Sequence, residues 1–179
     1  PLQSGSDKML KLMQRRYKID LYKGRVEKIK SVMPHACIGV DVIVGFPQET
    51  DDDFLDTYNF VNELDISYLH VFTYSERANT KAIEMDGVVP VPLRNQRNAM
   101  LRTLSEKKKR YFYQQFLGSE REALMEQEQH GEVMHGFTDN YIKVSMPFDT
   151  TKVNQLVHVE LQDFDDAGNV NAATVKMAH

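Results

Sequence analysis

The feature that most constrains the fold is an apolar segment that stops abruptly at a Gly-x-Pro sequence. The segment from Cys37 to Gly45 is nearly continuously apolar and rich in β-branched side chains, as expected of a strand buried on both faces of a parallel sheet. Gly45 and Pro47 end this strand, and the spacing of Thr50 and Asp53 predicts a capping box that starts a helix. Ligands of β/α domains bind on such loops, so the segment indicates either a binding loop or a plain strand-to-helix crossover.

Helices and strands alternate along the rest of the first half of the chain. The pattern predicts one further strand and three helices: a strand at Tyr68 to Thr73, and helices from Ser6 to Arg16, from Asp20 as its cap to Pro34, and from Asp51 to about Leu64. This alternation is typical of a parallel sheet with crossover helices.

A long amphipathic helix is expected after an aperiodic segment, Glu76 to Pro92, which is predicted to be a loop. The helix should run to about Leu117. Its large apolar side chains are expected to face the β/α part of the chain: Leu101, Leu104, Tyr111, Phe112 and Phe116.

The periodicity changes after Gly118. Five short alternating segments separated by turn clusters, the last running from Val170 to Met177, predict a small antiparallel β-barrel. We therefore expect an α/β domain over residues 1–117 and a β-barrel domain over residues 118–179.

The composition argues for a folded chain without a membrane partner. The chain has 179 residues, 41% of them hydrophobic, and its apolar runs fall short of the roughly 20 residues of a membrane-spanning helix. A single cysteine, Cys37, excludes a disulfide framework and favours the reducing cytoplasm; we expect it to be a small buried hydrophobe. The spacings H-x-H, H-E-x-x-H and C-x-x-C are absent, and His70 is expected to be a hydrogen-bonded core side chain rather than a ligand.

Four motifs follow one another in one order: Pro-Leu-Gln-Ser-Gly-Ser-Asp at residues 1–7, Leu-Met-Gln-Arg-Arg-Tyr at 12–17, Asp41 to Thr50, and Val-Phe-Thr-Tyr-Ser-Glu-Arg at 71–77. Together they resemble the second half of the radical S-adenosylmethionine methylthiotransferases. The stretch His135 to Val144 is similar to the TRAM domain, a small RNA-binding barrel of that family. Leu69 to Phe72 and His135 to Thr138 are most similar to the branch that acts on threonylcarbamoyladenosine in tRNA.

The resemblance implies an α/β fold, in which the C-terminal part of a radical S-adenosylmethionine (β/α) partial barrel is followed by a TRAM barrel. The implied whole enzyme methylthiolates C2 of N6-threonylcarbamoyladenosine beside the anticodon, with S-adenosylmethionine and two [4Fe–4S] clusters as cofactors. Its implied partner is the tRNA anticodon arm, and the sulfur donor stays open. Alternatives are isopentenyladenosine or a ribosomal protein as the substrate, or a non-catalytic RNA-binding module.

Cluster ligands are missing from this sequence. The family holds a cluster with a Cys-x-x-x-Cys-x-x-Cys triplet, whereas this chain has one cysteine. A [4Fe–4S] cluster needs about four ligands, so we expect none in this chain and no activity of the chain alone. Either a fragment that begins inside the barrel or a natural cysteine-free descendant would explain the difference.

By motif, the resemblance assigns S-adenosylmethionine contacts to strand ends and adjoining loops: Gln3, Ser4, Arg15 or Arg16, Gly45, Phe46, Pro47, Tyr74 and Ser75. Gly45 would allow close backbone approach, and an arginine would pair with the cofactor carboxylate. Simpler roles stay open, namely Ser4 in a helix-capping turn, solvated arginines, and Tyr74 in packing.

Two further residues of these loops are given structural roles. We favour Glu49 as a charge at a helix start over Glu49 as a polar anchor of the loop. Asn79, which replaces a family glycine, is expected to keep its turn because asparagine tolerates positive φ.

The net charge of −4 is unevenly distributed. Residues 92–118 carry seven basic and one acidic side chain, while residues 1–91 have a net charge of −3 and residues 119–179 of −7. The basic run predicts phosphate contacts, with a solvated helix face as the alternative. Its members are Arg94, Arg97, Arg102, Lys107, Lys108, Lys109 and Arg110. In the barrel, Phe137 and Tyr141 are expected to stack on RNA bases, with Lys143 beside them.

Overall fold

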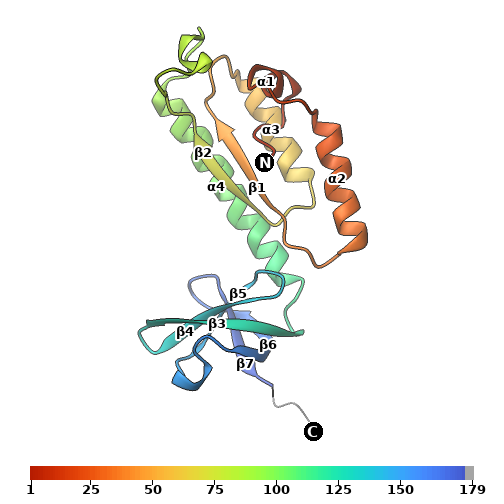
Figure 1. Cartoon of the computed structure of the whole chain (residues 1–179), viewed down its shortest axis with the longest axis vertical. Helices are drawn as coiled ribbons and strands as arrows, with labels where there is room; N and C mark the ends of the chain where they lie inside the picture. Colours follow the sequence, from red (N-terminus) through yellow and green to blue (C-terminus); the bar gives the residue numbers. More distant parts are fainter. Residues whose placement is uncertain (176–179) are drawn as a thin grey trace. The chain divides into compact units, whose positions relative to one another are not determined.

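The computed structural model describes residues 1–175 and divides into two compact units, the first comprising Pro1–Lys109 and the second beginning at Arg110 (Figure 1). The first unit combines helices with a parallel sheet, and the second is a closed β-barrel. Among the described residues, no helix is both long and apolar enough to cross a membrane.

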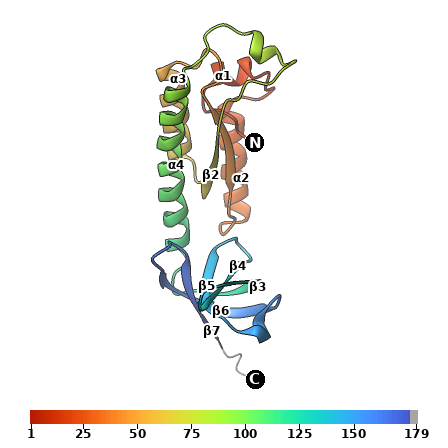
Figure 2. The same cartoon turned by 90° about the vertical axis from the view of Figure 1, so that its left-hand side faces the viewer.

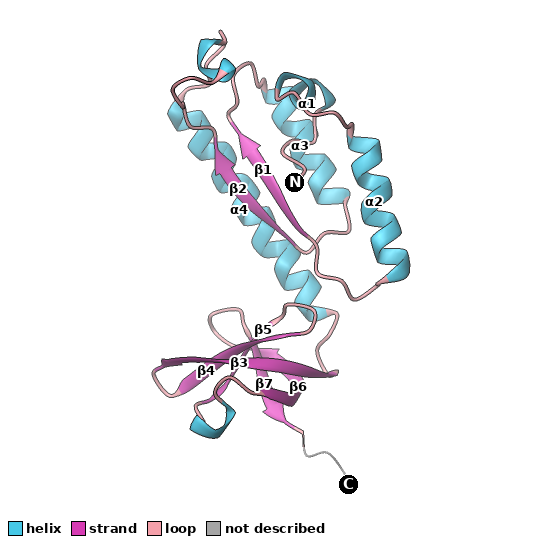
Figure 3. Ribbon diagram, viewed as in Figure 1, coloured by secondary structure: helices cyan, strands magenta, loops and turns pink. Residues whose placement is uncertain are grey.

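The sheet of the first unit has two parallel strands, β1 Gly39–Val44 and β2 Tyr68–Thr73 (Figure 3). Alternate side chains of β1, those of Val40, Val42 and Val44, are buried. On the other side of β1, Gln3 forms an isolated parallel bridge with Val42. Both predicted strands are confirmed, although β1 begins at Gly39 rather than at Cys37.

Four α-helices belong to this part of the chain: α1 Asp7–Leu12, α2 Ile19–Val32, α3 Asp51–Glu63 and α4 Val91–Gln114. Figures 1 and 2 show α3 and α4 covering one face of the sheet. Phe54 and Val61 of α3 join Leu101 and Leu104 of α4 in one core with the buried valines of β1. Each such buried side chain stabilises the fold by about 1.5–3 kcal/mol, so this core orders the strand ends.

Two helices begin at the side-chain caps that the sequence predicts. Ser6 is the N-cap of α1, and Thr50 with Asp53 forms the predicted capping box of α3. Hydrogen bonds from Lys8, Thr50 and Ser6 outweigh the effect of burial and lower the pKa of Asp53 to about 2. The first helix ends at Leu12, however, and not at Arg16 as predicted.

The cap predicted at Asp20 is wrong. The N-cap of α2 is Lys18, which makes no side-chain capping bond. Instead, Asp7 Oδ1 accepts the backbone N–H of Ile19 at 2.9 Å. A carboxylate at the start of α1 therefore supplies the acceptor that a local cap would provide.

Side chains of α4 cover the edge of β2 that β1 leaves open. Ser105 Oγ accepts the backbone N–H of Leu69 at 2.8 Å and donates to the carbonyl of the same residue at 3.0 Å. Asn98 Nδ2 donates to the carbonyl of Val71 at 3.4 Å. Buried backbone groups require such partners, so α4 replaces a neighbouring strand at this edge.

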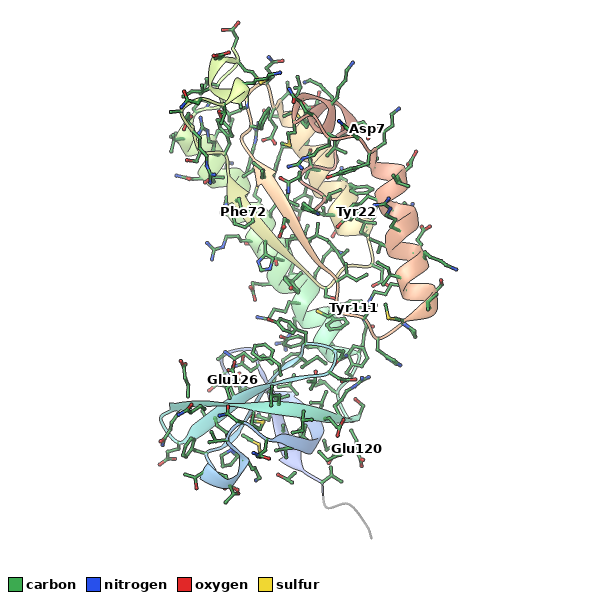
Figure 4. All side chains as sticks on the ribbon, viewed as in Figure 1. Asp7, Tyr22, Phe72, Tyr111, Glu120 and Glu126 are labelled. Atoms are coloured by element: carbon green, nitrogen blue, oxygen red, sulfur yellow. The ribbon has the colours of Figure 1, made fainter. Side chains whose placement is uncertain are left out.

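Three single-residue expectations are corrected by the fold. Tyr111 is 67% exposed, because Phe112, Tyr113 and Phe116 supply the buried side of the end of α4. His70 is exposed, with its ring edge-on to Tyr68, because it lies on the face of β2 opposite the buried Leu69. Phe72, labelled in Figure 4, lies on this same open face and is 54% exposed. Cys37 is half-buried rather than fully buried.

The predicted loop from Glu76 to Pro92 contains one 3-10 turn, η1 Lys81–Glu84, and α4 begins at Val91.

The second unit is a closed barrel of five strands in the order β3-β4-β5-β7-β6. The strands are β3 Glu120–His130, β4 Val133–Thr138, β5 Lys143–Pro147, β6 Leu156–Phe164 and β7 Val170–Thr174, with the turn η2 Thr150–Lys152 before β6. Its interior is filled by fully buried Met125, Met134, Ile142 and Leu161.

One strand pair departs from the predicted antiparallel barrel. β5 and β7 pair in parallel, whereas the other neighbouring strands pair antiparallel. Directions cannot alternate all the way around a closed ring with an odd number of strands, so one pair must be parallel. The end of the last predicted strand, Met177, lies outside the described residues.

Candidate functional site

A cavity of about 970 Å³ lies at the carboxyl end of β1, where the sequence predicts a binding loop. We call it the strand-end cavity. It is lined by Gln3, Lys8, Lys11, Leu12, Met13, Gln14, Arg15, Ile43, Phe46, Gln48, Lys81, Ala82 and Met85. The mixture of apolar side chains with a few amide and basic groups, and the volume, are typical of small-molecule sites.

A buried carboxylate holds the loop that follows β1. Glu49 Oε1 accepts the backbone N–H of Gly45 at 2.9 Å and pairs with Arg97 Nη1 at 2.7 Å. Burial raises the pKa of Glu49, although the hydrogen bond from Gly45 and the charge of Arg97 act against it. Our preference for a simple helix-start charge is therefore wrong. Glu49 is the polar anchor of the loop, and its partner lies on α4, far away in the sequence.

Two arginines of α4 are committed to this support. Arg94 donates to the carbonyl of Tyr74 at 2.9 Å and pairs with Glu76 at 2.6 Å. Arg97 pairs with Asp51 at 2.7 Å in addition to Glu49. The two arginines are 3% and 2% exposed, so the prediction that they form a phosphate-binding surface is wrong. Helical spacing does not reveal whether a cation meets solvent or a carboxylate.

The structure separates the predicted cofactor residues into two groups. Gln3, Arg15 and Phe46 line the strand-end cavity, whereas Arg16 lines a different cavity beside it. Ser4 is completely buried, and its Oγ lies 3.0 Å from Thr57 Oγ1. The Ser4 side chain thus joins the start of the chain to α3.

Four predicted cofactor residues belong to the loop region but do not line the cavity: Gly45, Pro47, Tyr74 and Ser75. The ring of Tyr74 meets Phe46 edge-on at 5.3 Å, and its buried Oη has no hydrogen-bond partner within residues 1–175. Pro47 is buried and Ser75 is exposed. The turn beyond them has the predicted positive φ, 63° at Asn79.

The residues present do not fit an iron–sulfur cluster. Cys37 is the one cysteine, and burial raises the pKa of its thiol, which disfavours the thiolate that binds metals. In the part of the chain that the structure describes, no group of three His, Cys, Asp or Glu side chains is placed to hold a metal ion. A cluster therefore has no ligand set here.

The predicted RNA-binding cations of α4 differ in their environments. Arg102 and Lys107 are exposed, and Lys109 lies 3.8 Å from Glu106. Lys108 Nζ donates to the carbonyls of Asn62 and Leu64 at 2.9 and 2.8 Å, and burial lowers its pKa. In the second unit, the guanidinium of Arg110 lies 4.0 Å from the centre of the Phe164 ring. Lys108 is thus occupied in closing the end of α3.

Two aromatic residues of the barrel lie together on its outer surface. Phe137 and Tyr141 stack with their ring centres 4.8 Å apart, and Tyr141 is 57% exposed. Directly opposite neighbours extend Phe137 into a row across four strands, with Lys143 on β5, Leu124 on β3 and Leu156 beyond it on β6. We call these four residues and Tyr141 the barrel row.

Sequence reasoning missed several cations around the strand-end cavity. Lys8, Lys11 and Lys81 line it, although none was predicted to do so. A signal was present, because residues 8–18 contain five basic and no acidic side chains. The negative net charge of residues 1–91 concealed it.

Comparison with known proteins gives named relatives, although no protein-family model matches the chain. The threonylcarbamoyladenosine tRNA methylthiotransferase of Bacillus subtilis is 37% identical over 165 residues, which cover 90% of this chain and 37% of that protein. The protein of the same name from Aquifex aeolicus is 40% identical over 143 residues, which cover 80% of this chain and 34% of the relative. The tRNA-2-methylthio-N(6)-dimethylallyladenosine synthase of Bacillus subtilis is 34% identical over 168 residues, which cover 90% of this chain and 32% of the relative.

These matches extend over nearly the whole chain, whereas the chain spans about a third of the length of the curated relatives. They confirm the resemblance that the sequence motifs indicated. The chain belongs to the radical S-adenosylmethionine methylthiotransferase family.

Proposed function

We propose that this chain is the part of a cytoplasmic tRNA methylthiotransferase that holds S-adenosylmethionine and contacts the RNA. The observation that carries the proposal is the strand-end cavity, which lies at the cofactor motifs of a chain homologous to methylthiotransferases over 90% of its length. On this proposal the chain comprises the C-terminal part of a radical S-adenosylmethionine partial barrel and a TRAM barrel, with a domain boundary after residue 117.

The chemistry of the strand-end cavity suits S-adenosylmethionine. Arg15 offers a bidentate partner for the carboxylate, and Phe46 offers a ring surface to the adenine. Gln3 supplies an amide for the polar edges of the nucleoside. The remaining proposed cofactor residues shape the surrounding loops: Ser4, Gly45, Pro47, Tyr74 and Ser75. Arg15 is preferred to Arg16 as the partner of the carboxylate, because Arg16 lines only the neighbouring cavity. When bound, the cofactor supplies the methyl group and, with two [4Fe–4S] clusters held outside this chain, the radical chemistry.

The proposed RNA contacts come from α4 and from the barrel row. They are Arg102, Lys107, Lys108, Lys109, Arg110, Phe137, Tyr141 and Lys143. The exposed ring of Tyr141 offers a stacking surface for an unpaired base, and stacking of one base is worth about 1–3 kcal/mol. Lys108 is the weakest of the phosphate contacts, because two carbonyls at the end of α3, those of Asn62 and Leu64, already accept from its ammonium group.

The proposed substrate is N6-threonylcarbamoyladenosine in the tRNA anticodon arm, methylthiolated at C2. Two relatives named for this nucleoside, at 37% and 40% identity, support it. Relatives named for dimethylallyladenosine match at comparable identities, 34% over 90% of the chain and 41% over 78% of it, which makes that nucleoside the second candidate.

Titration of the chain with S-adenosylmethionine in a calorimeter tests the cofactor site. Arg15→Gln should weaken binding by about tenfold, equivalent to about 1.4 kcal/mol, because the carboxylate loses its partner. Arg16→Gln is the matched control, since it removes the same charge one residue further on and outside the strand-end cavity. Equal affinities of the two variants, or no binding to the unaltered chain, would contradict the proposal.

A further inference from the structure

A second cavity, of about 670 Å³, lies where the end of α1 leads into α2. Eight residues line it: Asp7, Lys8, Lys11, Arg15, Arg16, Tyr17, Lys18 and Leu21. Five of the eight are basic. We call this region, in which Asp7 is labelled in Figure 4, the basic corner.

Most of the positive charge at the basic corner is uncompensated. Lys8 pairs with Asp53 at 2.6 Å, but no ion pair within residues 1–175 involves Lys11, Arg15, Arg16 or Lys18. The one carboxylate of the corner, on Asp7, accepts the backbone N–H of Ile19. Four like charges held together repel one another, so the arrangement favours a bound anion.

The backbone of the basic corner is held in place. Tyr17 Oη donates to the carbonyls of Pro1 and Leu2 at 2.7 and 3.0 Å, which ties the segment after α1 to the start of the chain. Asp7 ties the start of α2 to α1. The cations therefore project from a backbone that is held by hydrogen bonds to other segments of the first unit.

We propose that the basic corner binds the phosphodiester backbone of the RNA beside the strand-end cavity. Lys8, Lys11 and Arg15 line both cavities, so the two sites adjoin. A guanidinium matches the geometry of a phosphate, and repeated phosphates match a row of separate cations better than one small anion does. This inference rests on the proposed function, and it adds phosphate contacts on α1 and the segment after it to those proposed on α4.

The test measures binding of a fluorescent RNA stem-loop to the chain by anisotropy, between roughly 50 and 200 mM salt. The double variant Arg16→Gln/Lys18→Gln should lower the slope of log affinity against log salt by roughly 1.5, for two lost contacts. The matched control is Lys23→Gln/Arg25→Gln, which removes the same charge from exposed positions of α2 outside the basic corner. The control should keep the slope, and both variants should keep the affinity for S-adenosylmethionine.

An equal fall of the slope in both double variants would assign the effect to total charge and overturn the proposal. Displacement of the RNA by inorganic phosphate at the same concentration of phosphate groups would also overturn it, in favour of a small-anion site. An unchanged slope with intact S-adenosylmethionine binding removes the basic corner but leaves the proposed function standing. Absence of both RNA and S-adenosylmethionine binding overturns both.

Discussion

At the scale of single residues, the structure explains why position 45 is a glycine, which the family resemblance had assigned to cofactor binding. Its φ is 75°, a value that favours glycine, and a Cβ built on it would overlap Arg94 Cγ. Arg94 has little freedom to move, because its guanidinium bonds Glu76 and the carbonyl of Tyr74. The close neighbour of Gly45 is thus a side chain of α4, and this contact together with the positive φ favours glycine without any bound cofactor.

Gly45→Ala should therefore lower the free energy of unfolding of the first unit by roughly 3 kcal/mol, from the unfavourable φ and the displacement of Arg94. Gly87→Ala is the matched control in the same unit. Gly87 has nearly the same φ, 77°, but the added Cβ would be less crowded than at Gly45, with its nearest neighbours at 3.0 Å in the side chain and 3.3 Å in the backbone of Gln48. We expect a loss of about 1 kcal/mol there, measured by urea unfolding. Equal losses would show that Arg94 yields without cost.

At the scale of elements, α4 does what the next strand of a sheet would do. Its apolar side chains cover the sheet, its arginines anchor the loops after β1 and β2, and Ser105 satisfies both backbone groups of Leu69. The basic character of this helix, read from the sequence as an RNA-binding surface, is therefore divided between internal ion pairs and solvent.

Ser105→Ala should cost about 2 to 3 kcal/mol, because it leaves a buried N–H and a buried carbonyl of Leu69 without partners. Hydrogen exchange of the Leu69 amide should accelerate more than exchange elsewhere in β2. Thr103→Ala removes a hydroxyl from an exposed position of the same helix and should change stability by less than about 0.5 kcal/mol. A Leu69 amide that stays protected in Ser105→Ala would mean that another donor or acceptor replaces the hydroxyl.

At the scale of the whole molecule, each unit carries a different kind of surface. The first unit holds the strand-end cavity and the uncompensated cations of the basic corner. The second unit is strongly acidic but exposes the apolar and aromatic barrel row. In the proposed function, the cofactor site and most phosphate contacts thus belong to the first unit, and base stacking belongs to the second.

This division predicts where S-adenosylmethionine protects the chain. At 100 times its dissociation constant, the cofactor should stabilise the first unit by about 2.7 kcal/mol, which slows hydrogen exchange of its most protected amides about 100-fold. Hydrogen-exchange mass spectrometry should show the effect in β1 and α1, with β3 and β6 unchanged. The Arg15→Gln variant should show less protection at the same concentration. Protection centred on the barrel would place the cofactor in the wrong unit.

The sequence by itself determined the elements whose causes are local. The capping box of Thr50 and Asp53, the β2 strand, the turn at Asn79 and the five alternating segments of the barrel depend on residues near one another in the chain, and all are confirmed. The motifs that identified the family are equally local. Short-range hydrogen bonding and side-chain periodicity fix such features before any long-range contact forms.

The tertiary structure alone decided which charges are buried and how the barrel closes. Glu49 became an anchor because Arg97 reaches it from α4, and Arg15 lines both cavities whereas Arg16 lines only the second. The parallel pairing of β5 with β7 follows from closing an odd ring, which no stretch of sequence encodes. Charge pairing and strand order depend on distances between residues far apart in the chain, and local patterns carry no information on those distances.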